Sequence, residues 1–397
     1  MKPLSGIRIA DFTVHAAGPF CTHMLSQLGA ECIKIESAQR PDIFRKPHAV
    51  YGRAGPATFD QVASNKLSVR LNLKHPEGVA LARQLVAVSD VAAESFRAGV
   101  MARLGLGYED LRAVKPDIVM TSVSSSGQSG PDSHFAGYAP LFGAWGGLGH
   151  LTGYEDGPPV EMRHVMDHSV GMNAALATMA ALHRRRRMGQ GSHVDVAARE
   201  VASAMAGEAI TAASAGIEPR RMGNADPQRA PQGLYASRET DRWISICVTT
   251  DAEWVALARL MGRAELAAHP AYATAAARVA RREAVDAIVR DWAAVQEAEV
   301  AADGLQRVGI PAHVSWRASD IAGDPHMGAR RAVVEVTESD GRRRKAVGFP
   351  AGFSRSDAPG MDRGTPGLGE HEEYVYGELL GLDRRARDRL ADAQVIY

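Results

Sequence analysis

The sequence predicts an α/β protein in which a large Rossmann-like domain, built on a parallel sheet, is joined to a smaller α+β domain. Strand-like and helix-like runs alternate over the first 200 residues, as in parallel sheets covered by helices. A chain of 397 residues exceeds what one hydrophobic core usually serves, so two domains are expected. The composition, 45% hydrophobic and 23% charged, is that of a folded chain rather than a disordered one.

The chain opens with a strand–helix–strand unit. Residues 6–12 form an apolar run typical of a buried strand, and residues 16–19 predict a turn into a helix over 20–28. A second strand is predicted over 29–36. Such units are normally parallel and right-handed.

The same alternation continues downstream. Helices are predicted over 76–89 and 108–114, and strands over 90–94, 116–123 and 191–196. A further helix is predicted to begin at Asp167 and to continue through the helix-forming run 172–182, with another from Ala198. This order predicts helices on both faces of the sheet.

The composition changes after residue 215, which places the first part of the large domain at 1–215. Residues 216–233 contain three prolines and three glycines and predict a linker. The small domain then follows, with a strand over 243–248 and Ala- and Arg-rich helices to about residue 302, so that linker and small domain occupy 216–330. A second Pro/Gly-rich connector, 354–369, precedes two predicted helices within 370–393.

Charge and cysteine content limit the function classes. A net charge of zero argues against a general nucleic-acid binder, although it leaves a local basic pocket possible. Three widely spaced cysteines predict neither a disulfide framework nor a zinc ribbon. The N-terminus lacks a signal-peptide pattern, and the best apolar window, 170–182, is too short to span a membrane. A cytoplasmic protein is therefore expected.

Asp167 is the strongest candidate for chemistry. As an N-cap, its carboxylate would accept backbone N–H groups and be kept ionised by the helix dipole, an effect worth ~0.3–1 kcal/mol. A carboxylate fixed on a rigid element can act as a nucleophile. Local sequence alone favours a structural cap, because caps are far commoner than nucleophiles.

Other sites are poorly supported. After the first strand only Gly18 is available, followed by Pro19, so the glycine fingerprint of a nicotinamide site is missing. The glycine-rich segment 143–149 lacks the Lys-Ser/Thr of a P-loop; it could let backbone approach a ligand or form a tight loop. The chain has no Gly-x-Ser-x-Gly motif, and hence no anchor for a serine hydrolase.

A metal site is likewise not expected. Glu161, His164, Asp167 and His168 have spacings that could place ligands on one helical face. However, prolines lie just upstream and the helix is predicted to begin only at Asp167.

Short motifs follow one another in a specific order over nearly the whole chain. They are residues 4–12 with 17–19, 28–36, 64–66 with 71–74, 94–100 with 103–105, 127–131 with 136–138, Asp167 with Gly171, 223–224, 324–326 and 368–371. In this order they resemble the motifs of the family III CoA-transferases, the CaiB/BaiF family, which includes formyl-CoA and carnitine CoA-transferases.

The resemblance implies the family III fold: an interlocked homodimer in which each large domain combines the N-terminal part with a C-terminal return, here 331–397. It implies an enzyme with acyl-CoA and a small carboxylic acid as substrates and no tightly bound cofactor. Asp167 would attack the acyl-CoA thioester, form a mixed anhydride, and then carry CoA as an aspartyl thioester. This exchange needs neither ATP nor a metal.

Site residues carry over by position. His15, Ala16, Ala17, Gly18 and Tyr138 would form the acyl and thioester pocket, although a core tyrosine is the competing interpretation for Tyr138. CoA would be bound by two groups of residues, a main set and a set of weaker phosphate candidates that could equally be surface charges. The main set is Leu71, Leu73, Ser95, Phe96, Arg103 and Leu104, and the weaker set is Arg40, Lys74 and Arg97. Ser95 stands where many relatives have Asn.

Departures from the family pattern remove polar groups near the acyl pocket. Ala16 and Gly143 replace a frequent Gln, and Ala139 replaces a frequent acid. They favour a bulkier or more apolar acid. Two rival functions remain open. One is an α-methylacyl-CoA racemase, which needs a His base where Tyr138 stands; the other is a non-catalytic CoA-binding subunit of a hetero-oligomer. The sequence leaves donor, acceptor and homo- or hetero-oligomeric state open.

Overall fold

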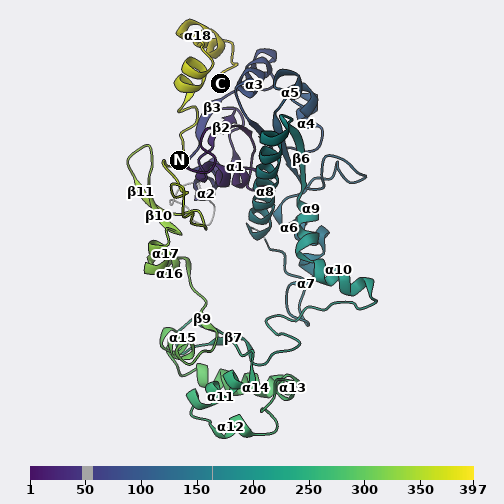
Figure 1. The fold of residues 1–397 in the computed structure, drawn as a ribbon, viewed down its shortest axis with the longest axis vertical. Coiled ribbons are helices and arrows are strands. Elements are labelled where there is room, and N and C mark those ends of the chain that lie inside the picture. The colour runs from purple at the N-terminus through teal and green to yellow at the C-terminus, as the bar shows by residue number, and fades with distance from the viewer. Residues whose placement is uncertain (47–56, 163) are drawn as a thin grey trace. The chain divides into compact units, whose positions relative to one another are not determined.

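The computed structural model describes residues 1–46, 57–162 and 164–397, and it divides into two compact units. Unit 1 comprises Met1–Gly149, Glu161–Ile217 and Pro325–Tyr397. Unit 2 comprises His150–Val160 and Glu218–Asp324. The chain therefore leaves unit 1 twice and returns to it twice, and Figure 1 follows this course by colour.

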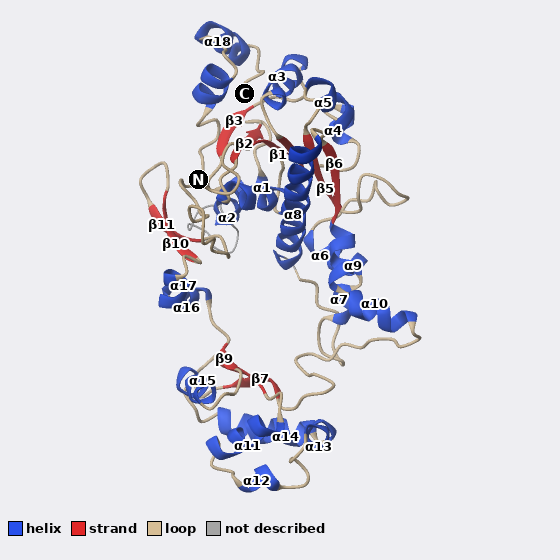
Figure 2. Ribbon diagram, in the orientation of Figure 1, coloured by secondary structure: helices blue, strands red, loops and turns tan. Residues whose placement is uncertain are grey.

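A parallel sheet forms the centre of unit 1 and, within the described residues, has six strands in the order β3-β2-β1-β4-β5-β6 (Figure 2). The strands are β1 (Arg8–Phe12), β2 (Glu31–Glu36), β3 (Leu67–Arg70), β4 (Val91–Glu94), β5 (Val119–Ser124) and β6 (Ser192–Ala197). Ala10 on β1 pairs with Ile33 on one side and Ala92 on the other. The strand order reverses between β1 and β4, and in open α/β sheets ligands bind outside the carboxyl ends at such a switch point.

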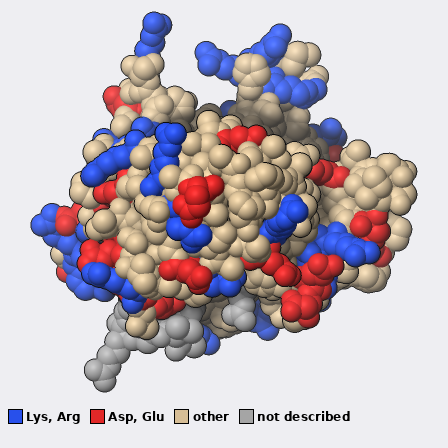
Figure 3. Space-filling model, turned by 90° about the horizontal axis from the view of Figure 1, so that it is seen from below, with Lys and Arg blue, Asp and Glu red and all other residues tan. Residues whose placement is uncertain are grey.

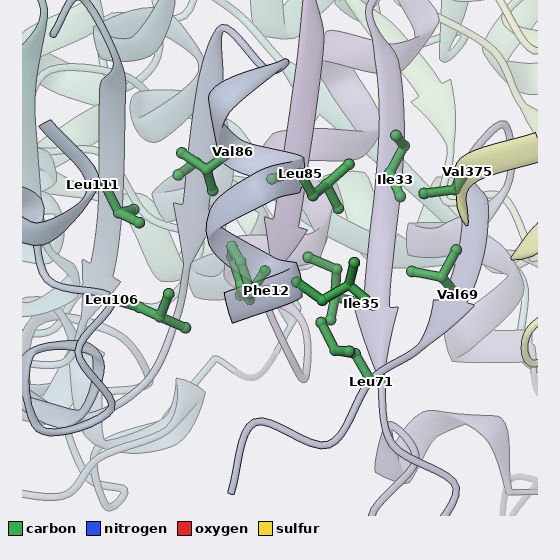
Figure 4. Packing of buried hydrophobic residues seen from close by; sticks show 14 of the residues in the cluster. Phe12, Ile33, Ile35, Val69, Leu71, Leu85, Val86, Leu106, Leu111 and Val375 are labelled. Atoms are coloured by element: carbon green, nitrogen blue, oxygen red, sulfur yellow. The ribbon is translucent and has the colours of Figure 1, made fainter. Parts of the chain in front are cut away.

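Helices cover both faces of this sheet. One apolar cluster joins it to α1 (Ala17–Gln27), α6 (Ala139–Gly146), α8 (His164–Met188) and α9 (Ala198–Met205). The cluster on the other face, drawn in Figure 4, includes α3 (Pro76–Ala87), α4 (Val100–Arg103) and α5 (Tyr108–Val114). Shorter elements of unit 1 are η1 (Ile43–Arg45), α2 (Ala57–Ala63) and α10 (Gly207–Ser214), while α7 (Leu148–Leu151) contains the first change of unit along the chain, at Gly149–His150.

The C-terminal segment completes the second of these clusters. It contains α17 (Pro325–Ala329), the hairpin β10 (Val333–Thr337) and β11 (Arg343–Val347), the π-helix η3 (Glu373–Leu379) and α18 (Arg384–Asp392). Val375 is fully buried and lies beside Val69 and Ile33 in Figure 4. The Tyr376 hydroxyl donates to the Arg70 carbonyl over 2.6 Å. Residues more than 300 positions apart thus share one core.

Unit 2 has its own core. An antiparallel sheet of β7 (Gln232–Ala236), β8 (Trp243–Cys247) and β9 (Ala312–Val314) packs against helices, with Trp254 fully buried between them. The helices of unit 2 are α11 (Asp251–Leu260), α12 (Glu265–Ala268), α13 (Ala275–Ala280), α14 (Arg282–Ala293), α15 (Ala298–Arg307) and α16 (Ala318–Gly323). The α+β character predicted for the smaller domain is confirmed.

The structure confirms the predicted α/β class and most predicted elements of the first half, and it corrects the starts of two helices. The helix predicted over 20–28, after a turn at 16–19, begins at Ala17. The helix predicted to begin at Asp167 begins at His164. None of the described helices combines the length and apolarity needed to cross a membrane. Acidic and basic side chains are interspersed on the face drawn in Figure 3, in keeping with the neutral net charge.

Candidate active site

A cavity of about 990 Å³ opens at the carboxyl ends of β1, β4 and β5, at the switch point of the sheet. All of its lining belongs to unit 1. The lining residues are 14–18, 43–44, 95–97, 123–125, 136–142, 164, 167 and 198. Most of these side chains are apolar, which is usual for small-molecule sites.

Asp167 faces this cavity from the first turn of α8. Because the helix begins at His164, the predicted N-cap role is wrong. Met166 and Val170 are both fully buried, and their packing explains why the helix extends upstream. No hydrogen bond or ion pair joins the Asp167 carboxylate to another described residue. Burial raises the pKa of Asp167 to about 6, so its surroundings disfavour the ionised form, contrary to the expectation from the helix dipole.

Two glycines bring Asp167 close to the loop after β1. Gly171 lies one turn after Asp167, and a Cβ there would be 2.7 Å from the Ala17 carbonyl oxygen and 3.1 Å from the Cys21 nitrogen. A Cβ on Gly18 would be 2.7 Å from the Cβ of Ser95. Only glycine permits these approaches, so α8, α1 and the loop after β4 meet at the cavity.

The loop after β1 is fixed by the loop after β4. The Ser95 hydroxyl accepts from the Val14 N–H and donates to the Val14 carbonyl, both over 2.9 Å. His15 follows with a φ of 65°, a left-handed conformation uncommon for residues with side chains. Ala17 and Gly18 then begin α1, where the helix itself offers their N–H groups no acceptor.

A buried acid orders the loop after β4. The Glu94 carboxylate accepts the Phe96 N–H over 2.7 Å, and burial raises its pKa to about 7. Gln128 accepts the Gly99 N–H over 3.3 Å, and its own N–H donates to Asp195 over 2.8 Å. Both ends of the loop that presents Phe96 are therefore tied down.

The structure brings together part of the predicted site. The residues that line the cavity are His15, Ala16, Ala17, Gly18, Ser95, Phe96, Arg97, Tyr138 and Asp167. Tyr138 is 69% exposed, so the competing interpretation as a core tyrosine is wrong.

The remaining predicted CoA residues lie outside this cavity. The Leu71 side chain is only 2% exposed and belongs to the core, and Leu73 and Leu104 pack partly buried against the same core. Arg40, Lys74 and Arg103 are exposed, as phosphate-binding side chains and ordinary surface charges both are.

Several residues of the site were missed from the sequence. Ile43, Phe44, Ser124 and His164 line the cavity, and the buried Ser124 hydroxyl has no partner among the described residues. Lys34 and Lys66 are fully buried behind the loop after β1. A signal for Lys34 exists, because a lysine inside the apolar run Cys32–Ile35 of a parallel strand must be paired.

Within ranges 1–46, 57–162 and 164–397 no group of three or more His, Cys, Asp or Glu side chains could hold a metal ion. The glycine-rich segment 143–149 lies in α6 and α7 and packs against Glu161, whose Oε1 would be 2.2 Å from a Cβ on Gly149. Gly143, Gly146 and Gly149 therefore serve close packing, whereas Gly147 has a positive φ of 84° and nothing within 4 Å of its Cβ position.

Comparison with known proteins identifies relatives over the full length. The model of CoA-transferase family III matches residues 4–372. The chain is 33% identical to the succinyl-CoA–D-citramalate CoA-transferase of Chloroflexus aurantiacus, covering 96% of this chain and 95% of that one. It is 32% identical to the beta subunit of succinyl-CoA–L-malate CoA-transferase from the same organism, covering 99% and 98%. The crystal structure of a CaiB/BaiF family protein from Brucella suis superposes with a TM-score of 0.86 at 30% identity, covering 95% of this chain and 99% of that one.

Proposed function

We propose that this chain, which belongs to CoA-transferase family III and is a CoA-transferase, moves CoA to its acid acceptor through a thioester on Asp167. The observation that carries the proposal is the partly buried Asp167 carboxylate in the cavity, with which no other described residue forms a hydrogen bond or ion pair. A structural acid in this position would normally be paired, because an unpaired buried charge costs stability. A nucleophile must be left free.

The chemistry proceeds by four substitutions at carbonyl carbons. An Asp167 oxygen attacks the thioester carbonyl, and the tetrahedral intermediate expels CoA as a thiolate, which leaves a mixed anhydride of Asp167 and the acyl group. The thiolate attacks the Asp167 carbonyl, which gives the aspartyl thioester and releases the first acid as a carboxylate. The incoming carboxylate attacks this thioester and expels the thiolate again. The thiolate then attacks the acyl carbonyl of the new anhydride, which forms the product and restores the Asp167 carboxylate.

The cavity supplies two further requirements. The N–H groups of Ala17 and Gly18, in the first turn of α1 and in the cavity wall, are the backbone donors that we assign to the developing oxyanion. The apolar lining keeps water away from the anhydride and the thioester, both of which hydrolyse.

The lining also bears on the acceptor acid. Ala16 and Ala139 line the cavity at positions where the family resemblance implies polar side chains, and Phe44, Phe96 and Phe142 add aromatic surface. We propose an apolar acid as the acceptor, in contrast to the relatives named for citramalate and malate. Transfer rates to an aromatic acid and to succinate or malate test this choice; a preference for the short dicarboxylates contradicts it.

The decisive experiment for the mechanism is intact-protein mass spectrometry after incubation with acyl-CoA donors and no acceptor. The wild type should gain the mass of CoA less one water, and the Asp167→Asn protein should gain nothing while binding CoA with similar affinity. A panel including succinyl-CoA and aromatic acyl-CoA donors is required, because the donor is unidentified. Turnover by Asp167→Asn would exclude this nucleophile.

A further inference from the structure

The loop that forms one wall of the cavity is held at both ends by a buried ion cluster. We define the pocket loop as residues 13–19. At its start, Thr13 donates its N–H and its hydroxyl to Asp11 Oδ1 over 2.9 and 2.5 Å. At its end, the Pro19 carbonyl accepts from Lys66 Nζ over 2.9 Å. The two clamping residues pair with each other, since Lys66 Nζ is 2.9 Å from Asp11 Oδ2.

Each of the three N–H groups of the Lys66 ammonium donates a hydrogen bond. Besides Asp11 and Pro19 it donates to Thr22 Oγ1 over 2.7 Å, and Thr22 in turn donates to Asp11 Oδ2 over 2.8 Å. The exposed fractions of Asp11, Thr22 and Lys66 are all 0%. A second buried lysine, Lys34, donates to the Thr13 carbonyl over 2.9 Å. These hydrogen bonds fix the orientation of the Thr13 and Pro19 backbone groups as well as their distance from the ion cluster.

Stability alone does not explain such a cluster. Transfer of two charges from water to the protein interior carries a desolvation penalty that their mutual attraction can fail to offset. Replacing a buried ion pair by hydrophobic residues of similar volume is therefore often neutral or stabilising. What an apolar side chain cannot do is hold the Pro19 carbonyl at a defined position. That carbonyl belongs to the first turn of α1, which also contains the cavity residues Ala17 and Gly18.

We propose that Lys66 is a positioning residue of the active site, which fixes the first turn of α1 against Asp167 by holding the Pro19 carbonyl and Asp11. This inference rests on the proposed function, because it takes Asp167 as the nucleophile. The effect is transmitted where α8 approaches α1, because the Ala17 carbonyl oxygen lies so close to Gly171 that a Cβ there would have no room. A displacement of this turn by about 1 Å would misplace the thioester, and such shifts can cost about 100-fold in rate.

The test compares three full-length variants with the wild type. Asp11→Asn/Lys66→Met removes both charges together, so that neither is left buried and unpaired. Thr22→Val keeps both charges and the side-chain volume but removes one hydrogen bond from each, which protects the test if the double variant does not fold. Arg185→Met is the control: it breaks a partly buried ion pair with Asp90, 2.7 Å long, at the amino end of β4, whereas the cavity lies at the carboxyl ends of the strands.

The readouts separate positioning from stability. Formation of the CoA adduct should slow about 10–100-fold in the double variant and less in Thr22→Val, with the Kd for CoA within about twofold of wild type. Arg185→Met should lower Tm but leave the adduct rate within about twofold. A folded double variant or a Thr22→Val protein that reacts at the wild-type rate overturns the proposal, as does an equal slowing in Arg185→Met.

Amide hydrogen exchange distinguishes failure of this inference from failure of the proposed function. The peptide covering residues 13–19 should exchange faster in the double variant than in the wild type and in Arg185→Met. If no donor labels wild-type Asp167 but this exchange still rises selectively, the proposed nucleophile fails and the clamp stands. Unchanged exchange in a folded double variant overturns the role of Lys66.

Discussion

Burial of Asp167 has two opposite effects on its reactivity: it makes the carboxylate more basic, and it lowers the fraction that is ionised. Burial raises its pKa to about 6, which makes the carboxylate more basic than an exposed aspartate. At neutral pH the group is still mostly ionised, and a more basic carboxylate is a better nucleophile. The absence of a partner among the described residues is therefore consistent with catalysis.

The rate of adduct formation should depend on the ionisation of Asp167. Because the pKa is about 6, the rate should reach a plateau above about pH 7 and fall about tenfold per pH unit well below pH 6. Pre-steady-state mass spectrometry across pH 4.5–8 measures it. Burial also raises the pKa of Glu94, to about 7, so its titration could produce a similar pH dependence. The Glu94→Gln variant removes this titration but keeps an oxygen that accepts the Phe96 N–H. An acid limb that disappears in Glu94→Gln would assign the dependence to the wrong acid.

The same pKa predicts that Asp167 destabilises the folded protein at neutral pH. The folded pKa, about 6, lies above the unfolded value, so the native state binds the proton more tightly. The cost is present in full above pH 6 and is lost as pH falls towards 4. Asp167→Asn should thus raise stability by about 1–3 kcal/mol at pH 7.5, and by little at pH 4. Thermal melts at pH 7.5 and pH 4 check this prediction. The control is Asp303→Asn, at an exposed position, which should leave stability unchanged at both pH values.

At the scale of elements, local sequence patterns predicted most of the sheet-forming half of the chain. The helix at 108–114 and the strands near residues 8–12 and 31–36 follow from apolar periodicity and turn residues. The start of α8 was wrong because aspartate is a strong N-cap signal, whereas burial of Met166 adds a further turn. The strand β3 was missed because Lys66 and Arg70, at its ends, disguise a buried strand.

Gly171 tests the contact between α1 and α8. Gly171→Ala should lower stability by about 1–3 kcal/mol, because its Cβ would meet backbone atoms of Ala17 and Cys21 as well as the Phe20 ring. It should also slow adduct formation, since α1 must move away from Asp167. The matched control is Gly304→Ala in α15, where a Cβ meets nothing within 4 Å and a gain of up to about 1 kcal/mol is expected. Urea melts of both variants decide the point; equal effects would contradict it.

At the scale of the whole molecule, the site depends on contacts that no local pattern contains. Lys66 meets Asp11 across 55 residues, and Tyr376 meets Arg70 across 306. The resemblance to a family singled out Asp167 and the loops that line the cavity with it, because motif order carries this long-range information. It could not identify Lys66 as a clamp, since its role depends on the position of one carbonyl.

The C-terminal return should be essential to the stability of unit 1. Val395 is fully buried, and its carbonyl accepts the Asn72 N–H over 2.9 Å. Val395→Ala should cost about 2–3 kcal/mol in a urea melt, because it leaves a cavity in the core. The control Val114→Ala, at a position 40% exposed in the same unit, should change stability by under about 1 kcal/mol. Equal losses would indicate that the C-terminal segment is only loosely packed.

From exposed apolar residues on α8 we propose a homodimer, the assembly that the family resemblance implies. Val165, Met172 and Leu176 are 49%, 46% and 63% exposed in the single chain, and a large exposed apolar surface commonly marks an interface. Light scattering should give twice the chain mass of 42.4 kDa, and Leu176→Glu should shift the protein towards monomer. Since one relative is a beta subunit, an inactive monomer that gains activity with a second, different chain would instead indicate a hetero-oligomer. An active wild-type monomer would contradict both assemblies.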